Sequence, residues 1–256
     1  MPVRPGAEPY RHDGGPVGVL LCHGFTGSPY ALRPLAEHLA AAGFSVSLPR
    51  LPGHGTTWQE MNLTRWEDWY AEVDRAYREL RGTCDQVAVF GLSMGGTLAL
   101  LLAEHYGADI PAVVLVNPSV TGLDKRLKAL PVLRYLTPSV RAIGDDIKKD
   151  GATELAYDRT PLKALYSLTR LWAAVRHDLG KIEQPILVFH SRVDHVVEPE
   201  NLEIIKARVS SSEVVVRELA NSYHVAVLDH DAPQIFAESV AFVREHTAAA
   251  HAAGDR

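Results

Sequence analysis

The stretch QVAVFGLSMGGTLALLLAEHY, residues 86–106, joins a strand-like apolar run to a helical pattern. Its Val-rich beginning predicts a short buried strand, and its Leu-rich second half predicts a helix. Ser93 therefore lies on a tight strand-to-helix turn, where Gly91 and Gly95 supply the small neighbours that such a turn requires. A serine on this kind of turn has a strained backbone and an exposed hydroxyl, so the stretch predicts a nucleophile.

Further apolar runs with the length of buried strands occur on both sides of this stretch, at 17–22, 44–48, 112–116, 185–190 and 213–219. Helical patterns lie between them, at 31–42, 66–81, 200–209 and 233–246. Strands without a polar face that alternate with helices are typical of a parallel sheet covered on both sides. The sequence therefore predicts an α/β protein with a mostly parallel central sheet and helices on both faces.

Composition limits the class of protein and its partners. The 256 residues fit a single domain, 1–256, with 46% hydrophobic and 22% charged residues. The net charge of −5 and the lack of a Lys/Arg run argue against nucleic acid or an anionic membrane surface as partner. No apolar run is long enough to span a membrane, and the first residues lack a signal-peptide core. We expect a cytoplasmic protein that is a monomer or weak dimer.

The two cysteines predict the same compartment. Cys22 ends one predicted strand and Cys84 precedes the next, so parallel neighbouring strands would hold the thiols at opposite ends. We therefore expect both thiols to be free, as in a reducing compartment.

One interval, about 118–182, interrupts the alternation of strands and helices. No strand is evident there, although apolar residues recur at helical spacing and prolines divide the interval. It predicts a mostly helical cap, which is either an ordinary insertion packed on the core or a mobile lid over an apolar pocket. The Ala-rich end from Thr247 is expected to fray.

A serine nucleophile needs a histidine base and an acid that orients the base. After a nucleophile on a strand-to-helix turn, the acid and then the histidine follow along the chain, on loops after strands. Asp194 follows the predicted strand 185–190 after a short polar turn, so we expect it to be the acid. A turn-capping role is the alternative. Asp145, Asp146 and Asp150 lie near lysines and predict a solvated face of the cap.

His224 is the candidate base, although the chain has 12 histidines. It follows the predicted strand 213–219 and a polar turn, just before the last helix. His230 lies among aspartates and predicts a surface position, and His190 ends a buried strand and predicts a core histidine. His195 directly follows the acid and is expected to point elsewhere.

Ester cleavage also needs donors for the negative charge that develops on the carbonyl oxygen. One donor is expected to be the Met94 N–H, directly after the nucleophile and at the start of a helix. The loop HGFTG, residues 23–27, follows the first long strand and offers the Phe25 N–H as the second.

No cofactor or metal is expected. His54 and His23 match no compact zinc spacing, and the Gly-rich context of His54 predicts a loop beside the active site. The chain has neither a G-x-x-x-x-G-K-[ST] loop nor a G-x-G-x-x-G after its first strand. The expected partner is therefore a small lipid or ester substrate.

These motifs together resemble the bacterial monoacylglycerol lipases and their carboxylesterase relatives in the α/β-hydrolase superfamily. The resemblance rests on five segments: HGFTGSP (23–29), LPRLPGHGT (48–56), GLSMGGT (91–97), DHVV (194–197) and NSYHVA (221–226). It implies the α/β-hydrolase fold and a carboxylic ester substrate.

The cap is also similar to this family in part. The segment ELAYDRTP, residues 154–161, resembles the stretch whose glutamate hydrogen-bonds the glycerol headgroup, which implies this role for Glu154. A carboxylate on a surface helix is the alternative. Ile143 matches an apolar cap residue near the pocket. Residues 120–139 depart from the family pattern, so acyl-chain preference stays open.

The combined prediction is a serine esterase that cleaves monoacylglycerols through an acyl-enzyme on Ser93. A general carboxylesterase for short- to medium-chain esters is the alternative enzyme. A hydrolase fold used only for ligand binding would lack a member of the triad, whereas Ser93, Asp194 and His224 are all present.

Overall fold

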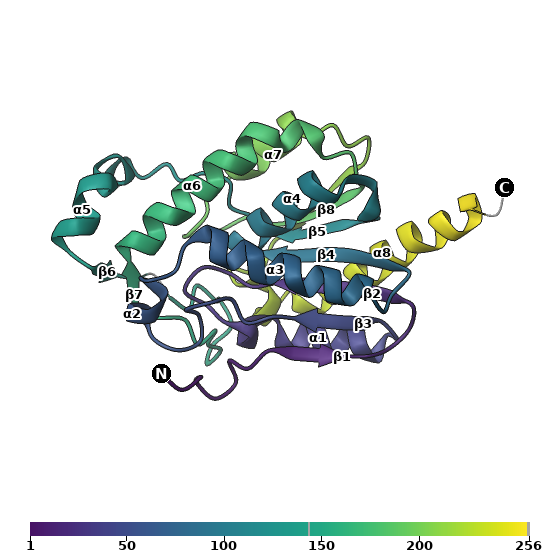
Figure 1. Ribbon diagram of the computed structural model, residues 1–256, viewed down its shortest axis with the longest axis horizontal. Helices are drawn as coiled ribbons and strands as arrows, with labels where there is room; N and C mark the ends of the chain where they lie inside the picture. The colour runs from purple at the N-terminus through teal and green to yellow at the C-terminus, as the bar shows by residue number, and fades with distance from the viewer. Residues whose placement is uncertain (143, 255–256) are drawn as a thin grey trace.

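The computed structural model describes residues 1–142 and 144–254 and centres on one seven-stranded sheet (Figure 1). The strand order is β1-β3-β2-β4-β5-β8-β9. All neighbours pair in parallel except β1, which runs antiparallel to β3. The bounds are β1 (Tyr10–His12), β2 (Val17–Cys22), β3 (Ser45–Leu48), β4 (Gln86–Leu92), β5 (Val113–Val116), β8 (Ile186–Ser191) and β9 (Val214–Leu219). The predicted mostly parallel sheet is confirmed.

Successive strand residues enter two separate hydrophobic cores, because side chains alternate between the faces of a strand. In β4, Val87 and Val89 join the core under α3 (Trp66–Arg81), α4 (Met94–Tyr106), α6 (Leu162–Asp178) and α7 (Glu200–Arg208). Ala88 and Phe90 join the opposite core, under α1 (Arg33–Ala41) and α8 (Ala232–Gly254). Helices on both faces of the sheet are therefore also confirmed.

Helix α3 shows how the sequence sets such a layer. Its fully buried side chains Trp69, Val73, Tyr77 and Leu80 recur every three or four residues and form one apolar stripe. At its beginning the Asp68 carboxylate accepts a hydrogen bond from the Arg65 N–H at 2.8 Å, which satisfies a free donor of the first turn. The remaining face is charged.

Strands β2 and β4 pair over their whole length, with Val17 opposite Gln86 and Cys22 opposite Gly91. Cys22 thus lies at the carboxyl end of the sheet, while Cys84 lies before the beginning of β4. Both thiols are free and buried, as the sequence predicts. Burial raises the pKa of the Cys22 thiol to about 12.

The interval between β5 and β8 contains α5 (Leu130–Leu136), the short strands β6 (Ser139–Arg141) and β7 (Arg159–Pro161), and α6. Helix α6 packs on α3 and α4 and buries Leu168, Leu171 and Val175 in the core on that face of the sheet. The segment between β5 and α6, which is the cap proper, carries α5 and the β6–β7 pair away from the sheet (Figure 1). The wider cap boundary of 118–182 stays a prediction.

The expectation that the interval of about 118–182 contains no strand is wrong, because β6 and β7 lie within it, and other short elements were not predicted at all. Strands β1, β6 and β7 have three residues each, too short to produce a periodic pattern, and α2 (Trp58–Met61) is a single turn. The end from Thr247 belongs to α8, which ends at Gly254, and its fraying stays a prediction.

Candidate active site

Ser93 lies between β4 and α4 with φ 56° and ψ −119°, a conformation that L-residues rarely adopt. The turn is possible because Gly91 and Gly95, two residues before and two residues after Ser93, have no Cβ. A Cβ on Gly95 would collide with the carbonyl oxygen of Cys22, and one on Gly91 would collide with the carbonyl oxygen of Gly95. The strained serine turn predicted from the sequence is present in the structure.

Asp194 and His224 meet at the carboxyl ends of the parallel strands, on the loops that follow β8 and β9. The His224 Nδ1 lies 2.8 Å from Asp194 Oδ2, and the two side chains are only 8% and 3% exposed. Asp194 Oδ1 also accepts the N–H groups of Val196 and Val197, each at 2.8 Å. This arrangement holds the imidazole in one orientation and favours a proton on Nδ1.

The electrostatics of this pair support a base on the other ring nitrogen. Burial alone would lower the pKa of His224, but the Asp194 charge and hydrogen bond outweigh it and raise that pKa above its ordinary value of 6.5. Burial opposes the charge on Asp194, but His224 and the two backbone donors outweigh it and lower the pKa of that carboxyl.

Ser93 lines the same cavity as His224. No hydrogen bond joins these two side chains among the described residues, which is common in hydrolases without substrate. The position of Ser93 is set through its backbone, since its N–H donates to Val116 O at 3.0 Å and its carbonyl accepts from Gly96 and Ser119.

Asn117 holds the two loops of the pair together, a role that we did not predict from the sequence. Its side-chain N–H donates to the His224 carbonyl at 2.7 Å, and its Oδ1 accepts the Ser191 N–H at 2.8 Å. Its φ of 44° is a left-handed conformation that asparagine tolerates better than most residues. An asparagine directly after a buried strand is the signal that could have indicated it.

The loop that carries Phe25 is fixed beside Ser93. His23 is fully buried, with Nδ1 3.1 Å from Gly24 O and Nε2 accepting the Leu51 N–H at 3.2 Å. Burial lowers the pKa of His23 to about 4, so this histidine is neutral and acts as a bridge between loops. Within the described chain, the N–H groups of Phe25 and Met94 donate to no other residue, so both remain available. Phe25 lines the cavity, whereas the Met94 side chain is buried in the core.

His54 lies beside His23, with 5.1 Å between the ring centroids, and its Nδ1 is 3.0 Å from Pro52 O. Burial lowers its pKa well below the usual range. In the described part of the chain, no group of three or more His, Cys, Asp or Glu side chains is placed to hold a metal ion. The helices described there also include none that is long and apolar enough to cross a membrane.

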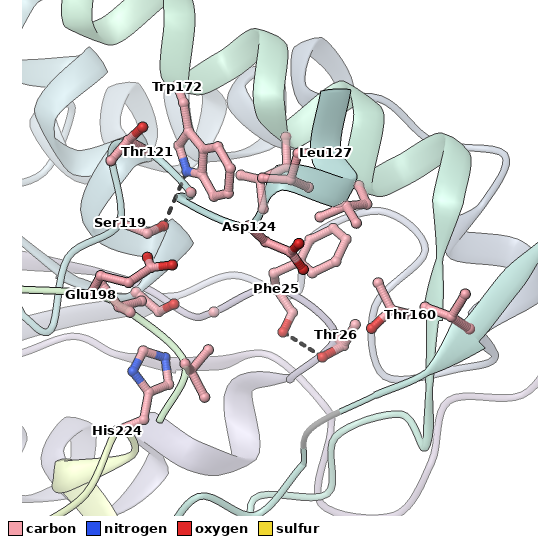
Figure 2. A pocket seen from close by; sticks show the side chains of 18 of the residues that line it. Phe25, Thr26, Ser119, Thr121, Asp124, Leu127, Thr160, Trp172, Glu198 and His224 are labelled. Carbon is pink, nitrogen blue, oxygen red and sulfur yellow. Dashed lines mark hydrogen bonds between the residues drawn. The ribbon is translucent and has the colours of Figure 1, made fainter. Parts of the chain in front are cut away.

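A cavity of about 570 Å³ begins at Ser93 and His224 and extends under the cap. Its far walls are apolar and include Leu127, Leu130 and Leu133 before α6 and Leu165, Leu168 and Trp172 on α6. Figure 2 shows His224 at one end and Trp172 across the cavity, where the indole N–H donates to Ser119 Oγ at 3.2 Å. Asp124 and Glu198 add polar groups to the lining, and Figure 2 shows Asp124 beside Phe25 and Glu198 nearer to His224. A cavity with extensive apolar walls beside Ser93 and His224 suits an ester with a hydrocarbon chain.

Glu154 lines this cavity and does not lie on a helix. Its Oε1 accepts the Asp145 N–H at 3.2 Å, and its Oε2 lies beside Gly27 in the loop of Phe25. Burial raises the pKa of Glu154, against the opposing effect of His224. Ile143, the second cap residue expected at the pocket, lies outside the described residues.

The expectation of a solvated face at Asp146 is wrong, whereas His230 is exposed, as the sequence predicts. The Asp146 side chain is only 10% exposed and contacts His195. His195 itself is 53% exposed and is not one of the described residues that line the cavity, in agreement with the expectation that it points elsewhere. Asp229 is 3% exposed and accepts backbone N–H groups of four residues. The proximity of Asp146 to Lys148 and Lys149 was misleading, because its carboxylate accepts the backbone N–H groups of His195 and His224 instead of facing solvent.

Comparisons with known proteins agree with this geometry. Residues 17–231 match the Hydrolase_4 family, described as serine aminopeptidase, S33. The chain is 46% identical to the thermostable monoacylglycerol lipase of Bacillus sp. (strain H-257), over 96% of this chain and 97% of that protein. It is 29% identical to a carboxylesterase of Bacillus subtilis (strain 168), over 88% and 91%. A solved structure from work on LipS and LipT, two metagenome-derived lipolytic enzymes, superposes with a TM-score of 0.93 and 41% identity, over 96% and 100%.

Proposed function

The chain belongs to the Hydrolase_4 family of the α/β-hydrolase superfamily, and from this premise we propose that it is a serine esterase that cleaves monoacylglycerols into glycerol and a fatty acid. The observation that carries the proposal is the 2.8 Å Asp194–His224 pair, whose histidine lines a largely apolar cavity together with Ser93. The 46% identity to a monoacylglycerol lipase supports the glyceride as substrate.

In the proposed mechanism, Ser93 Oγ attacks the acyl carbonyl while His224 Nε2 takes the hydroxyl proton. Asp194 keeps the imidazole oriented and stabilises its charged form. The N–H groups of Phe25 and Met94 stabilise the negative oxygen of the tetrahedral intermediate. The C–O bond to glycerol then breaks, and the leaving oxygen takes the proton from His224. Water, deprotonated by His224, attacks the acyl-enzyme and releases the fatty acid and free Ser93.

The acidic limb of the pH profile is expected to be set by the pKa of His224. A protonated imidazole cannot accept the Ser93 proton, so activity falls as the pH drops through the pKa of His224. Because Asp194 raises this pKa, kcat/KM should be half-maximal above pH 6.5. The Asp194→Asn variant should keep its remaining activity to lower pH. The measurement is kcat/KM for a p-nitrophenyl ester from pH 4.5 to 9, and an unshifted limb in the variant would contradict the assignment.

Glu154 is proposed to hydrogen-bond the glycerol headgroup, because its carboxylate lies beside the loop that carries the Phe25 N–H. The Glu154→Gln variant is therefore expected to reduce kcat/KM for 1-monolauroylglycerol by about 10-fold. For methyl laurate, which has no headgroup hydroxyls, the expected change is less than about threefold. The measurement is the ratio of the two kcat/KM values.

Glu198→Gln is the matched control, since Glu198 is a second carboxylate in the same cavity. It should change both esters alike and leave the ratio constant. Equal losses on both esters in Glu154→Gln would favour a general carboxylesterase, for which the Bacillus subtilis relative is the precedent. A panel of mono-, di- and trilauroylglycerol against methyl laurate tests the substrate class directly. The cytoplasmic location and the monomeric or weakly dimeric state stay predictions.

A further inference from the structure

A short segment of the cap, residues 145–149, runs across the loop that carries His224; we name this segment the strap. The strap and the loop exchange hydrogen bonds in both directions. The Asp229 carboxylate accepts the Lys148 N–H at 2.6 Å and the Lys149 N–H at 3.0 Å. The Lys148 Nζ donates to Asn221 Oδ1 at 2.7 Å, and the Val225 N–H donates to the Asp146 carbonyl at 3.1 Å.

The side chain of Asp146 makes the contacts nearest to the proposed triad. Its Oδ2 accepts the His224 N–H at 3.2 Å and the His195 N–H at 3.1 Å, and its Oδ1 lies 2.7 Å from His195 Nδ1. His195 is the residue directly after Asp194, so one carboxylate contacts both triad loops. A carboxylate that is 90% buried is costly without such partners, and here three donors satisfy it.

His224 is consequently held at three points by three different parts of the chain. Asp194 binds its imidazole, Asn117 binds its carbonyl at 2.7 Å, and Asp146 binds its N–H. The first two belong to loops at the end of the sheet, whereas Asp146 belongs to the cap. The position of His224 therefore depends on the cap as well as on the sheet.

We propose that Asp146 is a positioning residue for catalysis, whose carboxylate fixes the main chain of His224 and of the loop after Asp194 so that the imidazole stays within reach of Ser93. This inference rests on the proposed triad. It also couples the cap to the chemical step, because movement of the strap would release the His224 N–H.

The charge of Asp146 adds a separate effect that can be measured. The carboxylates that face His224 are Asp194 from the loop after β8 and Glu154 and Asp146 from the cap, and each of them raises the pKa of His224 against the effect of burial. Removing the Asp146 charge alone should lower that pKa, and the acidic limb of kcat/KM should move to lower pH.

Two substitutions separate these effects. Asp146→Ala removes both the charge and the acceptors, and a displaced imidazole should reduce kcat by about 10- to 100-fold with a change in KM of less than about threefold. In Asp146→Asn the amide oxygen can still accept both backbone N–H groups, and its NH₂ can donate to a His195 ring whose Nδ1 is unprotonated. This variant should keep kcat at pH 8.5 within about threefold of the unmodified enzyme, with its acidic limb at lower pH. Asp150→Ala, an exposed aspartate just beyond the strap, is the control and should leave kcat, KM and the pH profile unchanged.

All variants are measured with p-nitrophenyl butyrate, a small ester that does not require a glycerol site, with the melting temperature as a check of folding. The proposal is overturned if Asp146→Ala raises KM but leaves kcat within twofold, which would indicate a role in the cap alone. It is equally overturned if the pH profile of Asp146→Asn matches that of the unmodified enzyme. Full activity in Ser93→Ala would instead refute the proposed function itself, so the failure of this inference and the failure of the proposed function are distinguishable.

Discussion

Replacement of Ser93 by alanine is expected to reduce kcat for ester hydrolysis by at least about 10⁴-fold, because no acyl-enzyme can form without its hydroxyl. The residual rate would come from the Phe25 and Met94 N–H groups and from substrate binding. The protein should remain folded, since the Ser93 hydroxyl has no hydrogen-bond partner among the described residues. Alanine also meets the same backbone strain as serine at φ 56°. The measurement is kcat with 1-monolauroylglycerol, together with the melting temperature.

A fluorophosphonate probe gives an independent test of the same residue. The unmodified protein should carry one adduct on the peptide that contains Ser93, and the alanine variant should carry none. Ser210→Ala, which changes an exposed serine far along the chain, should label as the unmodified protein does. Near-native turnover in a folded Ser93→Ala protein would refute the serine esterase and favour a fold used only for binding.

Replacement of Gly95 by alanine is expected to damage both stability and catalysis. The new Cβ would collide with backbone atoms of Cys22 at the end of β2 and approach the carbonyl oxygen of His23 to 2.8 Å. Backbone in the middle of a sheet cannot yield as a flexible side chain can, so the expected loss exceeds about 3 kcal/mol of unfolding free energy. This corresponds to a fall in melting temperature of about 6–12 °C.

The molecules of this variant that do fold should also have a low kcat. Relief of the collision separates α4 from the loop of Phe25, so the two proposed oxyanion donors move apart and kcat should fall by about 100-fold. Gly180→Ala is the matched control, because its Cβ would meet nothing closer than 3.7 Å from Arg208 O. A melting temperature of Gly95→Ala within about 2 °C of the unmodified protein would contradict this prediction. It would show that α4 can move away from the end of β2 at little cost.

The sheet could be predicted because its long strands have strong local signals. Strand β2 begins and ends at the predicted residues 17 and 22, and helix α3 occupies the predicted 66–81. The order of strands could not be read from these signals, since pairing depends on contacts between distant residues. Short elements such as β1 were missed because three residues contain no period to detect.

The site was partly predictable for the same reason. Ser93, Asp194 and His224 each follow a recognisable strand, and the structure brings Asp194 and His224 into contact and places Ser93 in the same cavity. Asp146 was misjudged, because a carboxylate among lysines is usually solvated and its true partners are backbone groups more than 45 residues away. No local pattern encodes such a contact.

The two edge strands of the sheet affect how the protein behaves at high concentration. Exposed edge strands can pair with other chains and nucleate aggregates. Here one edge is the three-residue β1, which carries Arg11, and the other is β9, where Arg217 and Glu218 are exposed. A short edge and a charged edge both disfavour a continuous sheet between molecules. By pairing with β3, the short strand β1 thus covers an edge that would otherwise be free to pair with another chain.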